Sequence, residues 1–234
     1  MSRSFQTVYL LVFSSILFSS IFARPQTGSP TPAVVTFALD FPTSEPEHYS
    51  LRVQSDGAAR YQSSGRLSGN SAENDAHEND AHDNDKFDLD FTVTAETRQK
   101  IFDLAAKAGY FKNDVASHHK GMAFTGQKTL GYTDAQRSGE CTYNYSTVPA
   151  VQELTSLLQR LSTTLEFGHR LQYDRRYQKL ALDEELKRME EMVSSNQLIE
   201  VTAIRPILDQ IIADPAVINV SRARAQRLLE QAAH

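Results

Sequence analysis

The sequence predicts an α+β fold, with a small antiparallel sheet and one packed helix followed by an all-helical C-terminal region. Two observations lead to this prediction. Between residues 33 and 146, short segments with alternating or β-branched apolar residues surround a single segment with a helical apolar pattern. From residue 147 onward the apolar residues recur only at helical spacing. Strands grouped with one helix, and then helices alone, are the order expected of an α+β architecture.

The first strands are predicted on both sides of a tight turn. Residues 33–41, AVVTFALDF, are rich in β-branched and aromatic residues, which favour strands. Residues 48–65 alternate apolar and polar side chains around Asp56-Gly57, and these two residues tolerate the positive φ of a hairpin turn. Residues 86–93, KFDLDFTV, alternate again and predict a half-buried strand.

A helix and a second pair of strands complete the predicted sheet layer. Thr94 is a favourable N-cap for a helix that begins at residue 95, and Gly109 suits the left-handed conformation found at helix C-termini. After a polar loop, the segments QKTLGYTD and ECTYNYST predict two more strands. We expect this α+β domain to cover residues 33–165, with a disordered acidic insertion at residues 70–86.

Residues 166–234 are predicted to form the helical C-terminal region. Pro149 stands in the first turn of a helix that continues to about residue 193, with a break or bend at Gly168. Two shorter helices are expected near the C-terminal end, at about residues 200–213 and 222–232, the last of them capped by Ser221.

The N-terminal residues have the pattern of a secretory signal peptide. Arg3 precedes an apolar stretch at residues 8–22, and the small residue Ala23 follows it. We therefore expect a signal peptide at residues 1–23, a tether at residues 24–32, and export to the periplasm or the extracellular space. The alternative is an uncleaved membrane anchor, although the stretch is short for a bilayer span. We expect contact with a membrane only through this segment, if it is uncleaved.

Charge and cysteine content narrow the possible functions. The chain of 234 residues has a formal net charge of −5, whereas residues 73–90 hold eight acidic residues and one lysine, a local charge of −7. The remainder is therefore close to neutral, and no broad basic surface for nucleic acid is expected. The chain has one cysteine, Cys141, so no intramolecular disulfide can form and the core alone must hold the fold.

The acidic segment contains a repeat, ENDAHENDAHDND, at residues 73–85. Histidine and carboxylate are ligands for zinc, nickel or copper, so His77, His82, Asp80 and Asp85 form a candidate metal site. The five-residue spacing suits neither one face of a helix nor one face of a strand, and the glycine of a calcium loop is absent. The alternative interpretation is a duplicated, disordered acidic loop. The sequence assigns no other cofactor.

Motifs for catalysis are weak. Ser117 and Lys120 are spaced as in the nucleophile motif of penicillin-interacting enzymes, but the motifs that accompany it are missing or out of order. His118 and His119, in the loop at residues 112–126, could serve a hydrolase-type site. Cys141 lies in a predicted half-buried strand, where a packed thiol is expected. No residue is assigned a catalytic role.

Three segments resemble an uncharacterised bacterial domain found in exported proteins and lipoproteins: YSLRVQSDGAARYQ, VTAETRQKIFDLAAKAGYF and NYSTVPAVQELTSLLQRL. The resemblance extends over residues 49–161. That family often has a Cys-Phe-Gly-x-Cys-Pro element before its first hairpin strand, whereas this chain has PTSEPEHYS there. The resemblance implies an exported α+β domain and carries no activity with it.

These observations together predict an exported, non-catalytic binding protein. Its ligand is unknown, its partner is expected to be a protein or an envelope component, and the helical region would act as a docking or oligomerisation element. One alternative is a hydrolase-type enzyme with its site near His118 and His119. The other is weak binding of divalent metal by the repeat at residues 73–85.

Overall fold

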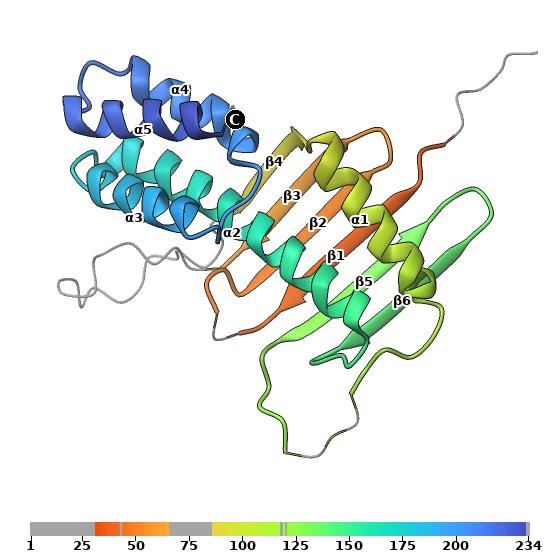
Figure 1. The fold of residues 1–234 in the computed structure, drawn as a ribbon. Coiled ribbons are helices and arrows are strands. Elements are labelled where there is room, and N and C mark those ends of the chain that lie inside the picture. Colours follow the sequence, from red (N-terminus) through yellow and green to blue (C-terminus); the bar gives the residue numbers. More distant parts are fainter. Residues whose placement is uncertain (1–30, 43, 66–85, 118, 120, 233–234) are drawn as a thin grey trace, which may run out of the picture. The chain divides into compact units, whose positions relative to one another are not determined.

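A six-stranded antiparallel sheet is the base of the fold (Figure 1). The computed structural model describes residues 31–42, 44–65, 86–117, 119 and 121–232, all of which belong to one unit. The sheet has the strand order β4-β3-β2-β1-β5-β6, so the first strand in the chain is central. The strands are β1 (Val34–Asp40), β2 (His48–Gln54), β3 (Ala58–Ser64), β4 (Phe87–Thr92), β5 (Gln127–Thr133) and β6 (Ser138–Tyr143).

The predicted hairpin is confirmed as the pair β2 and β3. Val53 pairs with Ala59 at its closed end, and Gly57 in the turn has a φ of 100°. The Asp56 carboxylate accepts a hydrogen bond from the Ala58 amide at 3.0 Å, which fixes the turn from within. Local sequence is therefore sufficient to specify this hairpin.

Helix α1 (Ala95–Lys107) begins and ends where the sequence predicts. The Thr94 hydroxyl accepts from the Thr97 amide at 3.3 Å, and Gly109 has a φ of 65°. Glu200, far along the chain, accepts a hydrogen bond from the Thr94 amide at 3.1 Å. The N-terminus of α1 is thus capped both by its own sequence and by a residue of the C-terminal region.

Two helices, not one, cover the sheet. Figure 1 shows α1 and the first half of α2 (Pro149–Tyr177) side by side across the same face. Pro149 stands in the first turn of α2, as predicted. The α+β class and the all-helical C-terminal part are confirmed, and α2 adds a second helix to the layer that covers the sheet.

The break expected at Gly168 is wrong. Helix α2 continues through Gly168 and through the predicted domain boundary at residue 165, and ends only at Tyr177. A Cβ atom at Gly168 would lie 2.6 Å from Cγ2 of Ile204, so this glycine allows a close approach between α2 and the segment before α4. One apolar cluster consequently extends without interruption from Val35 in β1 to Leu229 near the C-terminus.

The remaining helices pack around the second half of α2. They are α3 (Leu182–Ser194), the 3₁₀ turn η2 (Val201–Ile204), α4 (Arg205–Ala213) and α5 (Asn219–Gln231). The predicted cap at Ser221 is also wrong, because α5 begins at Asn219 and Ser221 is fully buried inside it. The burial of this position against the neighbouring helices is not visible in the local sequence.

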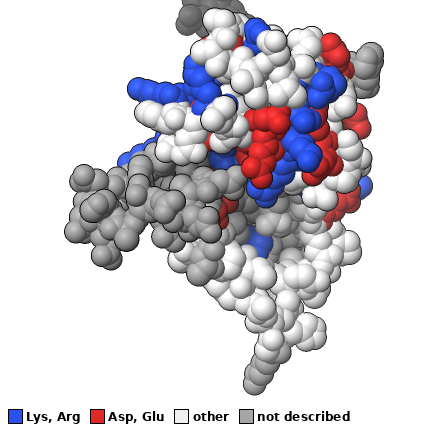
Figure 2. Space-filling model, turned by 90° about the vertical axis from the view of Figure 1, so that its left-hand side faces the viewer, with Lys and Arg blue, Asp and Glu red and all other residues white. Residues whose placement is uncertain are grey.

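Ion pairs join α3 to α5 on the outside of the helical part. Arg224 contacts Asp183 at 2.8 Å and Glu190 at 2.6 Å, and Arg227 contacts Glu190 at 2.8 Å. Figure 2 shows acidic and basic side chains alternating in a cluster on this end of the molecule. Networks of this kind contribute more than isolated surface pairs, which are worth about 0–1 kcal/mol each.

Several predicted segments lie outside the described residues. These are the signal peptide at 1–23, most of the tether at 24–32 and nearly all of the acidic insertion at 70–86. Among the residues that the structure describes, no helix is both long enough and apolar enough to cross a bilayer.

We predict that Gly168→Ala destabilises the protein. Alanine inside a helix usually gains about 0.5–1 kcal/mol over glycine, but here the new methyl group would meet Ile204. We expect a net loss of about 1–3 kcal/mol in the free energy of unfolding, measured by urea denaturation.

The matched control is the same substitution in an Ile204→Ala background, which removes Cγ2 and leaves Cδ1 of Ile207, at 3.1 Å, as the nearest atom to the new Cβ. There the substitution should cost clearly less stability than in the wild-type background. A gain in stability in both backgrounds would show that the approach of α2 to Ile204 is not tight.

Candidate functional site

Helix α2 carries a polar stripe on a buried face. Thr155, Gln159, Ser162 and Glu166 follow one another at intervals of three and four residues, so they share one side of the helix. Three of the four are buried, at 8%, 3% and 5% exposure for the threonine, the serine and the glutamate. Tyrosines from three strands meet this stripe: Tyr143 of β6, Tyr49 of β2 and Tyr61 of β3.

The hydroxyl of Tyr143 contacts that of Thr155. Because Thr155 Oγ1 donates its own hydrogen to the Val151 carbonyl at 2.7 Å, Tyr143 is the donor in this pair. Tyr49 hydrogen-bonds Ser162 and Gln159, and burial raises the pKa of Tyr49 and of Tyr143 well above the usual range. Both tyrosines therefore stay protonated, and Tyr143 is a fixed donor to α2.

Tyr61 donates to the Glu166 carboxylate at 2.7 Å. His169 lies beside the same carboxylate, with Nδ1 3.5 Å from Oε2, and its ring stacks on Phe87 with centroids 4.5 Å apart. Burial acts to raise the pKa of Glu166, but the neighbouring His169, Ser63 and Tyr61 groups outweigh it and lower that pKa. A buried, ionised carboxylate is thus held between the sheet and α2.

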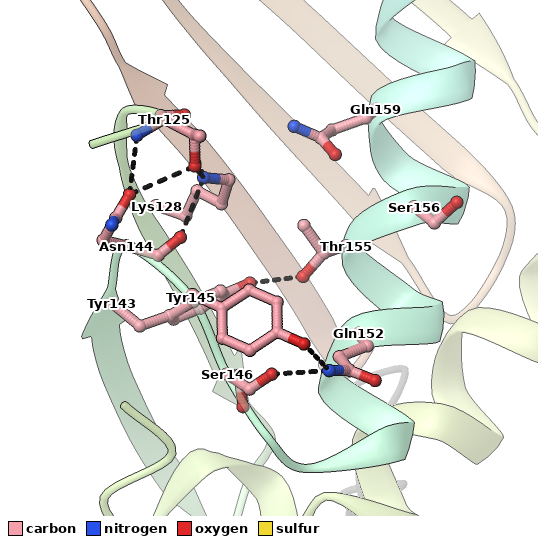
Figure 3. Close-up of a pocket in the computed structure, with 10 residues that line it drawn as sticks. All are labelled: Thr125, Lys128, Tyr143, Asn144, Tyr145, Ser146, Gln152, Thr155, Ser156 and Gln159. Atoms are coloured by element: carbon pink, nitrogen blue, oxygen red, sulfur yellow. Dashed lines mark hydrogen bonds between the residues drawn. The ribbon is translucent and has the colours of Figure 1, made fainter. Parts of the chain in front are cut away.

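A cavity of about 310 Å³ opens beside the first half of this stripe. Figure 3 shows its walls: Gln152, Ser156 and Gln159 project from α2, and Asn144 and Tyr145 follow the end of β6 on the opposite side. The amide of Gln159 points from the helix toward the strands. Polar groups from two distant parts of the chain therefore converge on one space.

A buried lysine forms the end of this cavity. Lys128 is 6% exposed, and its Nζ lies 3.0 Å from the carbonyl oxygens of Thr125 and Asn144 and 3.2 Å from that of Gly126. Burial lowers the pKa of Lys128. Its bonds to carbonyl oxygens nevertheless need N–H donors, which favours the ammonium form. None of the ion pairs found in the described part of the chain involves Lys128, so its positive charge has no carboxylate partner there.

Unused donors face the same cavity. The Tyr145 hydroxyl accepts from Gln152 Nε2 at 2.8 Å, which leaves its own hydrogen free to donate. The Ser156 hydroxyl makes no hydrogen bond within the described residues and lines the cavity from α2. A positive charge beside free O–H donors is the chemistry that accepts an anionic oxygen.

Apolar side chains stand next to the cavity. Met122 is 38% exposed, Phe124 58% and Tyr145 44%. The segment that contains the first two is fixed to the cavity wall, because Asn144 donates to the Ala123 carbonyl at 2.9 Å and accepts from the Thr125 amide at 2.8 Å. The site thus combines a polar interior with an exposed apolar border.

Gln159 also lines a second cavity of about 280 Å³, farther along α2. Glu166 and Arg170 belong to its walls. The Glu166 charge already faces Tyr61 and His169, and Arg170 pairs with Glu185. Glu166 and Arg170 are thus matched within the protein, whereas Lys128 in the first cavity has no carboxylate partner among the described residues, and we take the first cavity as the candidate for binding.

The candidate metal site lies outside the described residues. This applies to His77, His82, Asp80 and Asp85, so the structure does not test them. Among the residues that are described, no group of three or more His, Cys, Asp or Glu is placed to hold a metal ion.

The candidate hydrolase site lies partly outside the described residues. His118 lies outside the described residues, and His119 is exposed, with its amide directed to Ser117 Oγ. Cys141 is buried in β6, and burial raises its pKa to about 11, so it is a packed thiol rather than a ready nucleophile.

Sequence reasoning missed the cavity, although the signals were present. Lys128 has the same strand parity as Leu130 and Tyr132, and alternation therefore places it on the inward face of β5. The polar stripe of α2 likewise has a regular helical spacing. Apolar spacing alone does not reveal these faces, because the residues that carry them are polar.

No protein-family model matches this chain, and no curated protein is significantly similar to it. The resemblance to an exported bacterial domain therefore stays a prediction. The function must be inferred from the chemistry of the cavity.

We predict that Tyr61→Phe destabilises the protein by about 1.5–3 kcal/mol at neutral pH, because it removes a hydrogen bond to a charged group. The pKa of Glu166 is lower in the folded protein than its ordinary value of 4.5. Its ionised form therefore contributes stability above about pH 4.5, and this contribution is lost as the pH falls through the folded-state pKa. The difference between wild type and variant in urea denaturation should shrink in acid.

Tyr143→Phe is the matched control. It removes a bond between two neutral hydroxyl groups, that of Tyr143 in β6 and that of Thr155 on the same face of α2, so its cost should not change with pH in the acid range. Equal pH dependence for both variants would contradict the role assigned to the Glu166 carboxylate.

Proposed function

We propose that this is an exported, non-catalytic binding protein whose cavity between α2 and the β5–β6 pair takes up an acidic group of an envelope component. The N-terminal pattern at residues 1–23 supports export. The single observation that carries the binding proposal is the buried Lys128 with no carboxylate partner among the described residues.

Electrostatics favours an anionic group in this cavity. A buried ammonium ion keeps most of its field because little water is present to screen it. Carbonyl oxygens satisfy the hydrogen bonds of Lys128 but leave its net charge in place. A carboxylate that enters beside Tyr145 and Ser156 gains this attraction together with two hydroxyl donors.

The cavity has the size and lining of a site for one small polar ring. Its volume is at the lower end of the range of about 300–1,000 Å³ for small-molecule sites. Amide side chains from Gln152, Gln159 and Asn144 can bond hydroxyl groups, and the tyrosine ring offers an apolar face. A sugar acid unites these features, because it has hydroxyl groups, an apolar ring face and a carboxylate.

The protonation and hydrogen bonding of the polar groups support binding and not catalysis. Lys128 donates to several carbonyl oxygens, so it has no free lone pair to act as a base. The Cys141 thiol is held protonated in the sheet. The groups that line the cavity are hydroxyls, amides and one fixed cation, which recognise a ligand without transferring a proton.

The proposal predicts that the affinity for three sugars of the same ring size follows their charge. Glucuronate, glucose and glucosamine carry negative, zero and positive charge, and saturation-transfer NMR should show binding that declines in this order. Lys128→Met should remove the preference for glucuronate, while Lys100→Met, at an exposed lysine of α1, should leave it unchanged.

Lys128→Met also deletes several hydrogen bonds, so its fold needs a check by circular dichroism. Tyr145→Phe is a second variant at a half-exposed position that keeps the fold and removes one donor. We expect it to weaken binding of glucuronate by roughly five- to tenfold. Equal signals for the three sugars, or no signal, would overturn the proposed ligand class.

Export has its own test. We predict that the full chain, produced in a secreting bacterial host, yields a mature protein that begins at Arg24, identified by N-terminal sequencing. An unprocessed chain in the membrane fraction would support the alternative of an uncleaved anchor.

A further inference from the structure

The two cavities beside α2 lie on the same side of that helix. Ser156 lines the first cavity, Thr163 lines the second, and Gln159 lines both. Their spacing of three and four residues places them in one row, which spans about 10 Å along the helix axis. Ser156 is exposed and the other two are half-buried, so solvent reaches the whole row. The two cavities therefore adjoin at the Gln159 side chain.

The second cavity is balanced in charge. Among the described residues, its walls contain two acids, Glu45 and Glu166, and two bases, Arg170 and Arg188. Arg170 is paired in addition with Glu185 of α3. A carboxylate that entered this cavity would meet as many acids as bases and would gain no net attraction. In the first cavity, by contrast, a buried cation stands without a carboxylate partner among the described residues.

Two half-buried hydroxyl groups of the second cavity already use their hydrogens within the protein. Ser44 Oγ donates to the Pro46 carbonyl at 2.7 Å, and Thr163 Oγ1 donates to the Gln159 carbonyl at 2.9 Å. Each oxygen keeps lone pairs, so toward a ligand it acts as an acceptor. The ionised Glu166 carboxylate is likewise an acceptor. The second cavity therefore favours a ligand that brings its own O–H donors.

The first cavity offers the opposite hydrogen-bonding groups. There the hydroxyls of Tyr145 and Ser156 are free to donate, beside the positive charge of Lys128. A ligand that fills both cavities must present an anionic acceptor to the first and neutral hydroxyl groups to the second. The two spaces are also similar in size, about 310 Å³ and about 280 Å³, so each has room for one small ring.

We propose that the ligand is an oligosaccharide in which a sugar acid is linked to a neutral sugar, bound across both cavities. The acid lies in the first cavity, and the hydroxyl groups of the neutral ring donate to Ser44 and Thr163 in the second. The Gln159 amide, which points toward the strands (Figure 3), has both donors and an acceptor and bonds both rings. This inference rests on the proposed function, because Lys128 recognises the acid.

Titration calorimetry measures what the second ring adds. The probes are glucuronate, two linkage isomers of glucuronosyl-glucose, and a dimer of glucuronate. We expect one isomer of glucuronosyl-glucose to bind one per chain and at least roughly fivefold more tightly than glucuronate, because the second ring is held near its cavity by the first. The dimer should show no such gain, since its second carboxylate would meet Glu45 and Glu166.

Substitutions locate the second ring. Thr163→Val keeps nearly the same shape and loses the acceptor, so it should remove the gain and leave the affinity for glucuronate unchanged. Thr163→Ser keeps the hydroxyl and should retain most of the gain. The matched control is Ser194→Ala in α3, which also removes a hydroxyl bonded to the carbonyl four residues earlier but lines neither cavity. This control should bind every probe as wild type does.

The two proposals fail in different ways. Absence of binding by glucuronate itself would overturn the proposed function. If glucuronate binds, the second-ring inference alone is overturned by any of three results: no gain with either isomer, an equal gain with the dimer, or a full gain in Thr163→Val. Retained affinity for glucuronate shows that a variant is folded. The comparison of sugars on the wild-type protein decides the question even if a variant misfolds.

Discussion

The fold depends on the contact between α2 and the tyrosine hydroxyls of the sheet. Tyr143, Tyr49 and Tyr61 come from three strands, and each hydrogen-bonds polar side chains on the same helix face. Buried polar groups are costly when they are unpaired, so each tyrosine and its α2 partner require one another. This requirement fixes both the rotation of α2 about its axis and its position along the sheet, which apolar packing alone would specify less sharply.

Because α2 is fixed in this way, it connects the two parts of the molecule. Its first half covers the sheet with α1, and its second half is the support for α3, α4 and α5. Glu200 strengthens the connection by capping α1 from the C-terminal region. At 1.5 Å per residue, 29 residues make a helix of about 43 Å, long enough to serve both layers. The C-terminal helices are therefore part of the same core and not an attached tail.

The same helix also separates two surfaces of different character. The cavity with the buried Lys128 lies beside its first half, where polar groups from β6 and α2 converge. Four exposed apolar residues lie at its other end, where the α2–α3 and α4–α5 turns meet: Tyr177, Leu180, Ile218 and Val220.

The sequence by itself determined the local features: the hairpin at Asp56-Gly57, the Thr94 cap, Gly109, the alternating strands and the α+β order. Each of these depends on neighbouring residues only, so composition and spacing are sufficient. Only the tertiary structure decided that α2 passes Gly168 unbroken, that Ser221 is buried, and that Lys128 ends a cavity. These outcomes depend on partners that are distant in sequence: Gly168 meets Ile204, and Lys128 meets Asn144, 16 residues away. Local propensity contains no information about such contacts.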